Sequence, residues 1–546
     1  MGRSRLKFSL TEGKMAIYTA GMSDEEINGL LDLLAANQEQ TIDEDGYCKD
    51  RPISTEPIIS HWGLDNNNTR YQSRSNVDSS NVGSLKLKWV FGIPETAEVR
   101  SYPAVSTDTI FLPTTANQMF AIDRDLGCIK WVYKSDAPLR TSAFLSTIND
   151  MAVVAVADSS SSVHLLDATK GTKIWETSVS IHPFSMTTGS PVIHASDLYV
   201  PISSFEIVVA ANPEHECCTS HGAVARLDGM TGDSKWLTRT VGPPEKTKPN
   251  KVGTQMWGPS GAPVWTSPAI DPKRNQLYVG TGENTSSPAS DMSDAILALD
   301  LDDGTINWLF QATPKDAFNM ACGRWGDGNA NCPEEKGPDF DFGGSPVIVT
   351  DSKGQDLVLA GQKSGDVWAL NADNGEIVWH RRLSPGSALG GVHWGTAVVG
   401  NVLVVPIADP PVQNANPGVY GLDIDTGELL WEQKGNYHCE EAGFFSKADC
   451  ERPHRFSAAT SGVGDIAFAG SLKGSVYAIR VTDGEILWEF ETNQKFDSVN
   501  KIKTKGGSID NPGVAIAGSQ VMVLSGYALF GQDGGNALLM FELDDS

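Results

Sequence analysis

The chain has 546 residues, a formal net charge of −26 at pH 7 and a sequence pI near 4.7. Such an acidic balance argues against nucleic acid or an anionic membrane surface as a partner, and no apolar run is long enough to span a bilayer. A hydrophobic content of 40% with 54 glycines is typical of a turn-rich, all-β globular protein.

Residues 1–36 predict one short helix and show no signal-peptide pattern. Ser23 is a suitable N-cap, Glu26 stands three residues later as in a capping box, and apolar residues recur at helical spacing to Leu34. With Met15 ahead of it, this helix resembles the last helix of a class I cytochrome c, whose Met ligates the haem. No CxxCH sequence occurs, so we expect no covalent haem in this chain and interpret the segment as a remnant or a truncated end. A plain capping helix is the alternative.

Residues 37–60 are polar and acidic and predict a linker, and residues 61–546 predict a single β-propeller. Its repeating unit is clearest at 422–431, LDIDTGELLW, which reads as a strand, a tight turn at Gly427 and a strand ending in Trp. The same phrase recurs at 122–131, 166–175, 227–236, 299–308, 370–379 and 479–488.

The two ends of the propeller region predict how the ring closes. An eighth Trp, Trp89, ends a strand without the turn before it, and residues 537–544 form a strand without a turn after it. Pairing these two strands builds one blade from both chain ends and removes the exposed sheet edges. Eight Trp-ended units therefore predict an eight-bladed all-β propeller, with every repeat Trp packed between blades.

The chain has eight cysteines, an even number that suggests disulfides and an oxidising compartment. Cys322 and Cys332 bracket one loop, Cys439 and Cys450 bracket another, and Cys48 with Cys128 is a candidate third pair, although connectivity cannot be read from sequence. The adjacent Cys217 and Cys218 favour a vicinal disulfide, with pairing of one of them elsewhere as the alternative.

The long middle blades contain the candidate chemistry. Trp257 and Trp265 end no blade phrase, so at least one is expected to line the central funnel as a flat stacking surface. Arg140 and Lys363 stand at strand–turn junctions, where two cations in an acidic protein suit an anionic ligand. Each of these cations is equally consistent with a surface salt bridge.

Carboxylates in the same blades suit a metal and a base. Glu206, together with Glu283 or Asn284, offers the oxygen ligands that calcium prefers, although a solvated loop carboxylate is the simpler interpretation of Glu206 alone. Asp339 and Asp341 are flanked by aromatic residues and glycines, and a carboxylate beside a metal can act as a general base.

These residues resemble the pyrroloquinoline quinone (PQQ) dehydrogenases, which are eight-bladed quinoproteins, from about residue 60 to the end. The blocks GPSGAPVWTSPAID, LYVGTGEN, TPKDAFN and GPDFDFGGSP look most like the polyvinyl alcohol dehydrogenases. Members of that group join a cytochrome c segment to the N-terminal side of the propeller, which would explain the helix after Met15.

The resemblance implies a role for each matched position. Trp265 would stack under the quinone, Cys217–Cys218 would cover its other face, Lys363 would contact its reactive edge and Trp394 would lie nearby. The cofactor's carboxylates and carbonyls would be bound by Arg140, Thr188 and Ser203. The metal would be held by Glu206, Glu283, Asn284, Asp339 and Asp341.

Two departures from the family pattern bear on the metal and the base. The family's second metal ligand is an Asn directly after GTG, where this chain has Glu283 and then Asn284. The base falls on Asp339 if DFDFGGSP is matched to the family's Asp-aromatic-Asp block, whereas matching TPKDAFN places Asn319 there, which cannot accept a proton. We prefer Asp339, and Asp341 resembles the extra acidic residue found where a lanthanide replaces calcium.

The implied reaction is PQQ-dependent oxidation of a secondary or polymeric alcohol, with Asp339 taking the hydroxyl proton while hydride moves to the quinone. The resemblance further implies a bound calcium ion, a cytochrome c as electron acceptor and a periplasmic or secreted location. Two non-enzymatic alternatives are a scaffold propeller, like the outer-membrane assembly lipoprotein, and a sugar- or polymer-binding protein. A scaffold needs neither a vicinal cysteine pair nor a tryptophan such as Trp265.

Overall fold

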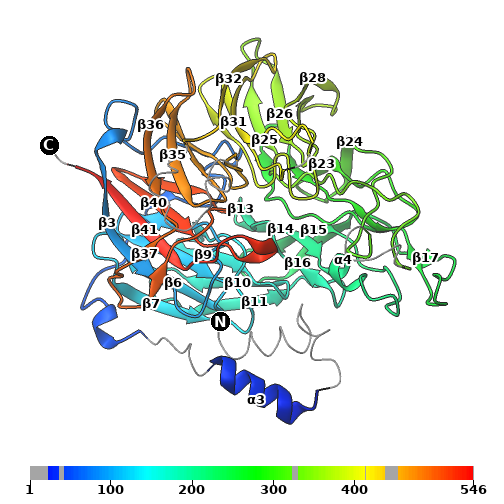
Figure 1. Cartoon of the computed structure of the whole chain (residues 1–546), viewed down its shortest axis with the longest axis horizontal. Coiled ribbons are helices and arrows are strands. Elements are labelled where there is room, and N and C mark those ends of the chain that lie inside the picture. The colour runs from blue at the N-terminus through cyan, green and yellow to red at the C-terminus, as the bar shows by residue number, and fades with distance from the viewer. Residues whose placement is uncertain (1–21, 36–41, 323–329, 412, 437–452, 545–546) are drawn as a thin grey trace.

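The computed structural model describes residues 22–35, 42–322, 330–411, 413–436 and 453–544, and shows eight β-sheet blades arranged in a ring (Figure 1). The first four blades contain β1 (Pro57–Ile59) with β4–β7 (Ala104–Ser106, Thr109–Thr114, Gln118–Asp123, Ile129–Lys134); β8–β11 (Phe144–Ile148, Met151–Ala157, Ser162–Asp167, Lys173–Ser178); β12–β16 (Ser185–Met186, Val192–His194, Asp197–Ser204, Ala223–Asp228, Ser234–Arg239); and β20, β21, β23 and β24 (Ala269–Asp271, Gln276–Gly280, Ala295–Asp300, Ile306–Gln311).

The remaining four blades complete the ring. They contain β25–β28 (Val347–Thr350, Asp356–Gly361, Asp366–Asn371, Ile377–Arg382); β29–β32 (Ala397–Val399, Val402–Ile407, Gly418–Asp423, Leu429–Gln433); β2 (Tyr71–Gln72) with β33–β36 (Ser461–Val463, Ile466–Gly470, Ser475–Arg480, Ile486–Glu491); and β3 (Leu85–Gly92) with β39–β41 (Val514–Ala517, Gln520–Ser525, Ala537–Leu543). Short pairs in the loops are β17–β18 (Glu245–Lys246, Trp257–Gly258), β19–β22 (Ser260–Gly261, Asn284–Ser286) and β37–β38 (Lys495–Phe496, Thr504–Lys505).

The ring closes as the sequence predicts. β3 pairs antiparallel with β41, which places Trp89 beside Met540 and joins the two ends of the propeller in one blade. Figure 1 shows these strands, blue and red, lying side by side. The closure completes the eighth blade and leaves no unpaired strand between the chain ends, which is the physical reason for building one blade from both.

The repeat tryptophans pack between blades, as predicted. The indole N–H of Trp379 donates to the carbonyl of Ile424 in the next blade, at 2.8 Å, and six other repeat tryptophans make the equivalent bond. The turn glycine of the next blade lies flat on the same indole: a Cβ on Gly427, whose φ is +70°, would stand 2.6 Å from the Trp379 ring. The repeated pattern therefore links seven of the eight neighbouring pairs of blades.

The N-terminal segment contains the predicted helix, α3 (Asp24–Ala35), within the described residues. Its capping box forms as expected, because the Glu26 backbone N–H donates to Ser23 Oγ and the Ser23 N–H donates to Glu26 Oε2. Met15 lies outside the described residues. No helix in the described ranges is both long enough and apolar enough to cross a membrane.

Residues 42–60 lie against the propeller instead of forming a free linker. Cys48 is bonded to Cys128, Tyr47 pairs with Ile129, and β1 adds a strand to a blade. The disulfides Cys217–Cys218 and Cys322–Cys332 also form. Cys439 and Cys450 fall outside the described residues.

The strand order places two kinds of loop at one end of the ring. Within each blade the four strands run antiparallel in chain order, so the loop after the second strand and the loop leading to the next blade share an end. Residues 205–222, 281–294 and 362–365 follow second strands, and the segments before β8, β13, β20, β25 and β29 enter new blades. Every predicted site residue except Ser203, which lies on β14, comes from these loops, which we call the cavity end.

Candidate active site

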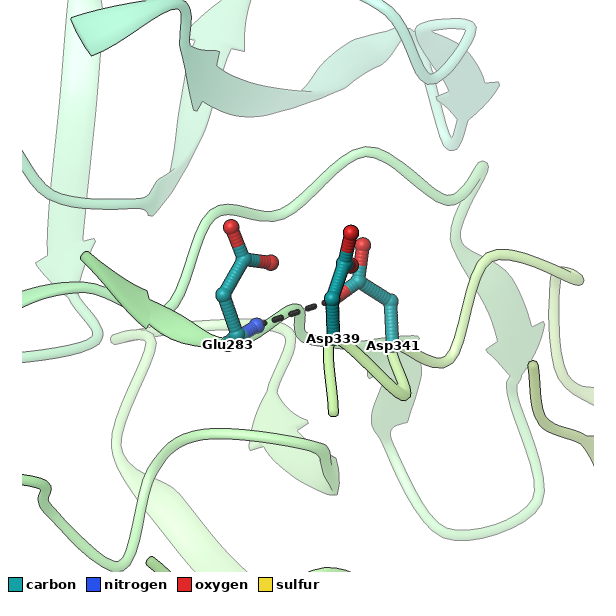
Figure 2. Close-up of side chains that lie close together, drawn as sticks. All are labelled: Glu283, Asp339 and Asp341. Atoms are coloured by element: carbon teal, nitrogen blue, oxygen red, sulfur yellow. Dashed lines mark hydrogen bonds between the residues drawn. The ribbon is translucent and has the colours of Figure 1, made fainter. Parts of the chain in front are cut away.

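Three carboxyl groups gather at the cavity end. Oxygen atoms of Glu283, Asp339 and Asp341 all lie within 4.8 Å of one another, and all three residues are buried. Figure 2 shows their carboxyl groups on the same side of the two loops that carry them, with the Glu283 N–H donating to Asp341 Oδ1 at 2.9 Å. Such a group of oxygens can hold a hard cation.

Lys363 compensates part of this charge. Its Nζ donates to Asp339 Oδ1 and to Asp341 Oδ2, each at 2.8 Å. Burial would lower the pKa of Lys363, but the two aspartates raise it, so the ammonium stays charged. When all three carboxyls are ionised, as a bound cation would favour, three carboxylates and one ammonium leave two negative charges without a partner inside this cluster.

The pKa values within the cluster diverge. Burial, together with Asp341 and Asp339, raises the pKa of Glu283 well above its usual value. Burial also raises the pKa of Asp339, to about 8, against the opposing effect of Lys363. Burial acts on Asp341 too, but Lys363 and Glu283 hold the pKa of that carboxyl below its usual value. Asp341 is therefore the carboxylate that carries the charge most readily, and Asp339 is close to a neutral-pH base.

Asp316 holds the turn that carries Asp339. Its carboxylate accepts the backbone N–H groups of Asp339, at 3.3 Å, and of Phe340, at 2.9 Å. Asp339 has a left-handed φ of +63°, so this turn needs such support. Sequence reasoning missed Asp316, although it stands in the TPKDAFN block in which only Asn319 attracted attention.

A cavity adjoins the carboxylate cluster through Trp265, whose indole N–H donates to Asp341 Oδ2 at 3.1 Å. Lys363 Nζ also lies 5.2 Å from the Trp265 ring, and Trp394 meets the same ring edge-on at 5.2 Å. Of the two candidate tryptophans, Trp265 lines the cavity, whereas Trp257 sits in β18 and bonds to Glu216. The cavity is lined by Trp62, Arg100, Arg140, Ser142, Thr188, Gly189, Ser190, Trp265, Ser267, Gly343, Ser345, Trp394 and Asn511.

Two guanidinium groups line this cavity, and that of Arg100 is paired with the Glu98 carboxylate at 3.1 Å. Burial, with a smaller contribution from the neighbouring Arg100, lowers the pKa of Arg140 to about 9. Arg140 Nε has no hydrogen-bond partner among the described residues, and its Nη1 reaches only the sulfur of Met186, at 4.0 Å. Two adjacent arginines, one of them short of partners, suit an anionic ligand. Arg100 has no motif around it that could have identified it from sequence.

Glu206 does not join the carboxylate cluster. It begins the short helix α4 (Glu206–Val209), and its carboxylate bonds to His215 Nε2 at 3.0 Å and accepts the N–H groups of Thr219 and Ser220. Burial alone would raise the pKa of Glu206, but these hydrogen bonds outweigh it and lower the pKa below its usual value. The carboxylate thus fixes the loop that follows α4, and both its oxygens are already engaged.

Four more predicted residues lie apart from the cavity or the cluster. Asn284 donates to the Ser260 carbonyl at 2.8 Å and accepts from Ser290, so its amide is a structural link. The described residues that line the cavity do not include Ser203, Cys217 or Cys218. The cysteine pair packs with Ala210 and Met256 and lies 4.0 Å from Asn319 Nδ2.

Asn319 is also a structural residue here. Its buried Nδ2 donates to the carbonyls of Thr285 and Asn331, each at 2.9 Å, and its Oδ1 accepts the N–H of Ala321. Of the two candidate positions for the base, Asp339 is the one that places a carboxylate in the cluster with Lys363.

Comparison with known proteins identifies the family. The family model described as "Glucose/ethanol/alcohol dehydrogenase, beta-propeller domain" matches residues 60–323, and the one described as "Outer membrane protein assembly factor BamB" matches residues 258–528. Polyvinylalcohol dehydrogenases from a Pseudomonas species and from Sphingopyxis sp. (strain 113P3) are each 34% identical to this chain, over 517 and 512 residues. These alignments cover 90% and 88% of this chain, and 78% and 76% of the two relatives.

A solved structure supports the fold. The quinohemoprotein alcohol dehydrogenase from Comamonas testosteroni superposes with a TM-score of 0.63 at 18% identity, covering 90% of this chain and 81% of that one. The long alignments to the two polyvinylalcohol dehydrogenases decide between the two overlapping family models. The chain therefore belongs to the PQQ-dependent quinoprotein alcohol dehydrogenases and is an oxidoreductase that acts on alcohols.

Proposed function

We propose that this chain oxidises a secondary alcohol, borne on a small molecule or a polymer, with bound PQQ and a metal ion, and passes the electrons to a cytochrome c. The observation that carries the proposal is the buried cluster of Glu283, Asp339, Asp341 and Lys363, joined through Trp265 to a cavity with two arginines. The names of the two 34%-identical relatives support a polymeric alcohol as substrate.

The carboxylate cluster fits a metal ion in its chemistry. Oxygen ligands suit calcium, and the two uncompensated negative charges match a divalent cation. Glu283 and Asp341 would hold it with Asp339 at its side. We leave Glu206 and Asn284 out of the metal set, because Glu206 lies outside the cluster of carboxyl oxygens and the Asn284 amide oxygen accepts two bonds from Ser290. Calcium is the ion we propose, and a third carboxylate makes a lanthanide the alternative to test.

The cavity fits PQQ in its donor set. Trp265 offers the stacking surface, Trp394 stands against its edge, and Arg140 with Arg100 and Thr188 offer donors for carboxylates. The cavity has a volume of about 20 Å³, which is room for about one water molecule. A cofactor of several rings therefore requires the lining side chains to open as it binds. Cys217–Cys218 does not line the cavity, so it would cover the quinone only if the loop after α4 moves together with the lining side chains.

Asp339 is the proposed base. PQQ with its metal, when bound, supplies the electrophile that accepts hydride. Burial in the cluster raises the pKa of the Asp339 carboxyl to about 8, and this carboxylate would take the hydroxyl proton of the alcohol. Lys363 fixes the orientation of this carboxylate, and Asp316 fixes the turn beneath it.

We further propose a periplasmic or secreted location. The described residues contain three disulfides, Cys48–Cys128, Cys217–Cys218 and Cys322–Cys332, and no free cysteine. Disulfides persist mainly in oxidising compartments. Mass spectrometry under non-reducing conditions tests this, because mostly free thiols would argue against it.

Reconstitution tests the function. Purified protein is incubated with PQQ and either calcium or lanthanum, and quinone absorbance is measured together with dye-linked oxidation of secondary alcohols and of polyvinyl alcohol. We expect both signals in the parent protein and neither in Trp265→Ala, which loses the stacking surface; Trp257→Ala is the matched control, since Trp257 does not line the cavity. A parent protein that binds no PQQ with either metal would refute the proposal.

A further inference from the structure

A groove rich in lysine lies at the cavity end of the blade that closes the ring. It has a volume of about 920 Å³ and is lined by Glu95–Ala97, residues 495–498, 501–505 and 534–536. Four of these residues are lysines, Lys495, Lys501, Lys503 and Lys505, and two are carboxylates, Glu95 and Asp497. The groove therefore has an excess of positive charge in a protein whose net charge is −26.

Chain connectivity places the groove close to the cavity. Ala97 lines the groove and Arg100 lines the cavity, so at three residues' separation their Cα atoms are at most about 11 Å apart. The segment 534–536 follows a second strand and residues 495–505 lead to a new blade, so both begin at the cavity end. The groove therefore opens beside the proposed active site.

The arrangement of the lysines concentrates their charge. Lys501, Lys503 and Lys505 are exposed and alternate with the buried Ile502 and Thr504, as on one face of a strand. β37 and β38 pair so that Lys495 stands directly opposite Lys505. Like charges directly opposite each other destabilise a strand pair.

The hairpin is held on the blade by backbone atoms and Asn500, and not by the ammonium groups of Lys495 and Lys505. The hairpin 495–505 folds over the edge strand β3: Val499 N–H donates to the Val90 carbonyl, and Asn500 exchanges two hydrogen bonds with Gly92. Those contacts cover the strand edge through backbone atoms and Asn500. Of the lysine ammonium groups, that of Lys501 pairs with the exposed Asp45 at 2.9 Å.

We propose that this groove docks the acidic face of the protein that accepts the electrons. The inference rests on the proposed function, in which oxidation of one alcohol to a carbonyl releases two protons and two electrons, and two acceptor molecules each take one electron. An acceptor bound here lies beside the cavity. Complementary charges raise the association rate of the two proteins, and this effect weakens as salt is added.

The test uses a double charge reversal, Lys495→Glu with Lys505→Glu, in the full chain. Its matched control reverses two exposed lysines at the opposite end of the ring, Lys170→Glu with Lys353→Glu, which changes net charge equally. Each protein, loaded with PQQ and calcium, is assayed with a strongly acidic c-type cytochrome, a strongly basic one and a neutral dye. Binding of the acidic cytochrome is also measured by calorimetry on protein without cofactor.

We expect the Lys495/Lys505 variant to reduce the acidic cytochrome roughly tenfold more slowly at low salt and to bind it correspondingly more weakly. The dye-linked rate and the control variant should match the parent, and added salt should erase the difference. Equal reduction and binding of the acidic cytochrome by parent and variant would overturn the docking proposal. Failure of dye-linked turnover in the parent would instead count against the proposed function, while the calorimetry would still decide the docking.

Discussion

At the scale of single residues, the site depends on how burial sets charge. Asp339 and Asp341 stand two positions apart and share Lys363, yet their pKa values move in opposite directions because Asp341 also accepts bonds from Glu283 and Trp265. Two neighbouring carboxyls held in different protonation ranges are typical of acid–base sites. This difference could not be read from the spacing DFDF.

Replacing Asp339 tests the base. Asn is isosteric with Asp and tolerates the left-handed φ of +63°, so Asp339→Asn should keep the turn while losing the proton acceptor. We expect turnover to fall roughly a hundredfold or more, measured per molecule loaded with PQQ and metal. Asn319→Ala is the comparison: it should unfold more readily, since two carbonyls lose their donor, but keep most of its turnover once loaded. Near-parental turnover in loaded Asp339→Asn would exclude Asp339 as the base.

The burial of His61 predicts that the folded protein loses stability in acid. His61 stacks on Phe144 at 4.4 Å, bonds to Ser60 Oγ and the Asp65 carbonyl, and lies near Arg70. Burial lowers its pKa from 6.5 to about 4, so the unfolded chain binds this proton more readily. The stability that neutral His61 contributes is therefore present above pH 6.5 and is lost as the pH falls toward 4.

The expected loss from this one group between pH 7.5 and 4.5 is about 2.5 kcal/mol. Urea unfolding of the parent and of His61→Gln at both pH values isolates the contribution of His61, because the other groups titrate alike in the two proteins. The parent should lose more stability than the variant on acidification. An identical loss in both would show that His61 is not held neutral by the fold.

At the scale of elements, the sequence repeat of the blades predicted the fold because each of its recurring residues has a packing role. The Trp bonds to the next blade, the turn Gly makes room for the preceding Trp, and the alternating apolar residues fill the interior of the sheet. These contacts recur at seven of the eight blade interfaces, so seven copies of one local pattern suffice to define the ring.

The loops that carry the site were only partly predictable, because their paths do not follow a recurring local pattern. Trp265, Lys363, Asp339 and Asp341 come together, but the contribution of Glu206 depends on the path of the loop that returns through His215 and Ser220. A loop path set by distant partners leaves no periodic signal. Arg100 likewise enters the cavity because of where its blade lies in the ring.

Gly427 and Gly400 separate two costs of replacing glycine. Both have positive φ, +70° and +58°, but a Cβ on Gly427 would meet the Trp379 ring at 2.6 Å, whereas nothing lies within 4 Å of one on Gly400. Gly400→Ala should cost about 1 kcal/mol from backbone strain alone. Gly427→Ala should cost about 1–3 kcal/mol more, because the indole must shift and its bond to Ile424 weakens. Equal unfolding free energies for the two variants would show that the Gly–Trp contact does not stabilise the ring.

At the scale of the whole molecule, the two ends of the chain depend on each other. β41 lies between β3 and β40, so it completes the last blade from both sides and joins residues more than 400 positions apart. Cys48–Cys128 adds a second tie, closing a loop of about 80 residues. In the chain-entropy account a crosslink of that length contributes up to about 4.5 kcal/mol by restricting the unfolded chain.

Truncation at the C-terminus tests the closure. A chain ending at residue 536 lacks β41, so β3 and β40 would each expose a row of backbone N–H and carbonyl groups, and buried Leu539 and Phe541 would leave the core. Exposed edges of that kind pair with other chains, so we expect this protein in the insoluble fraction. A chain ending at residue 544 keeps all of β41 and should remain soluble with the near-ultraviolet circular dichroism of the parent. Because the Cys48–Cys128 tie is intact in both, the difference between them reports the strand and not the disulfide. Recovery of the shorter chain as a soluble monomer with parental circular dichroism would mean that the ring holds without its closing strand.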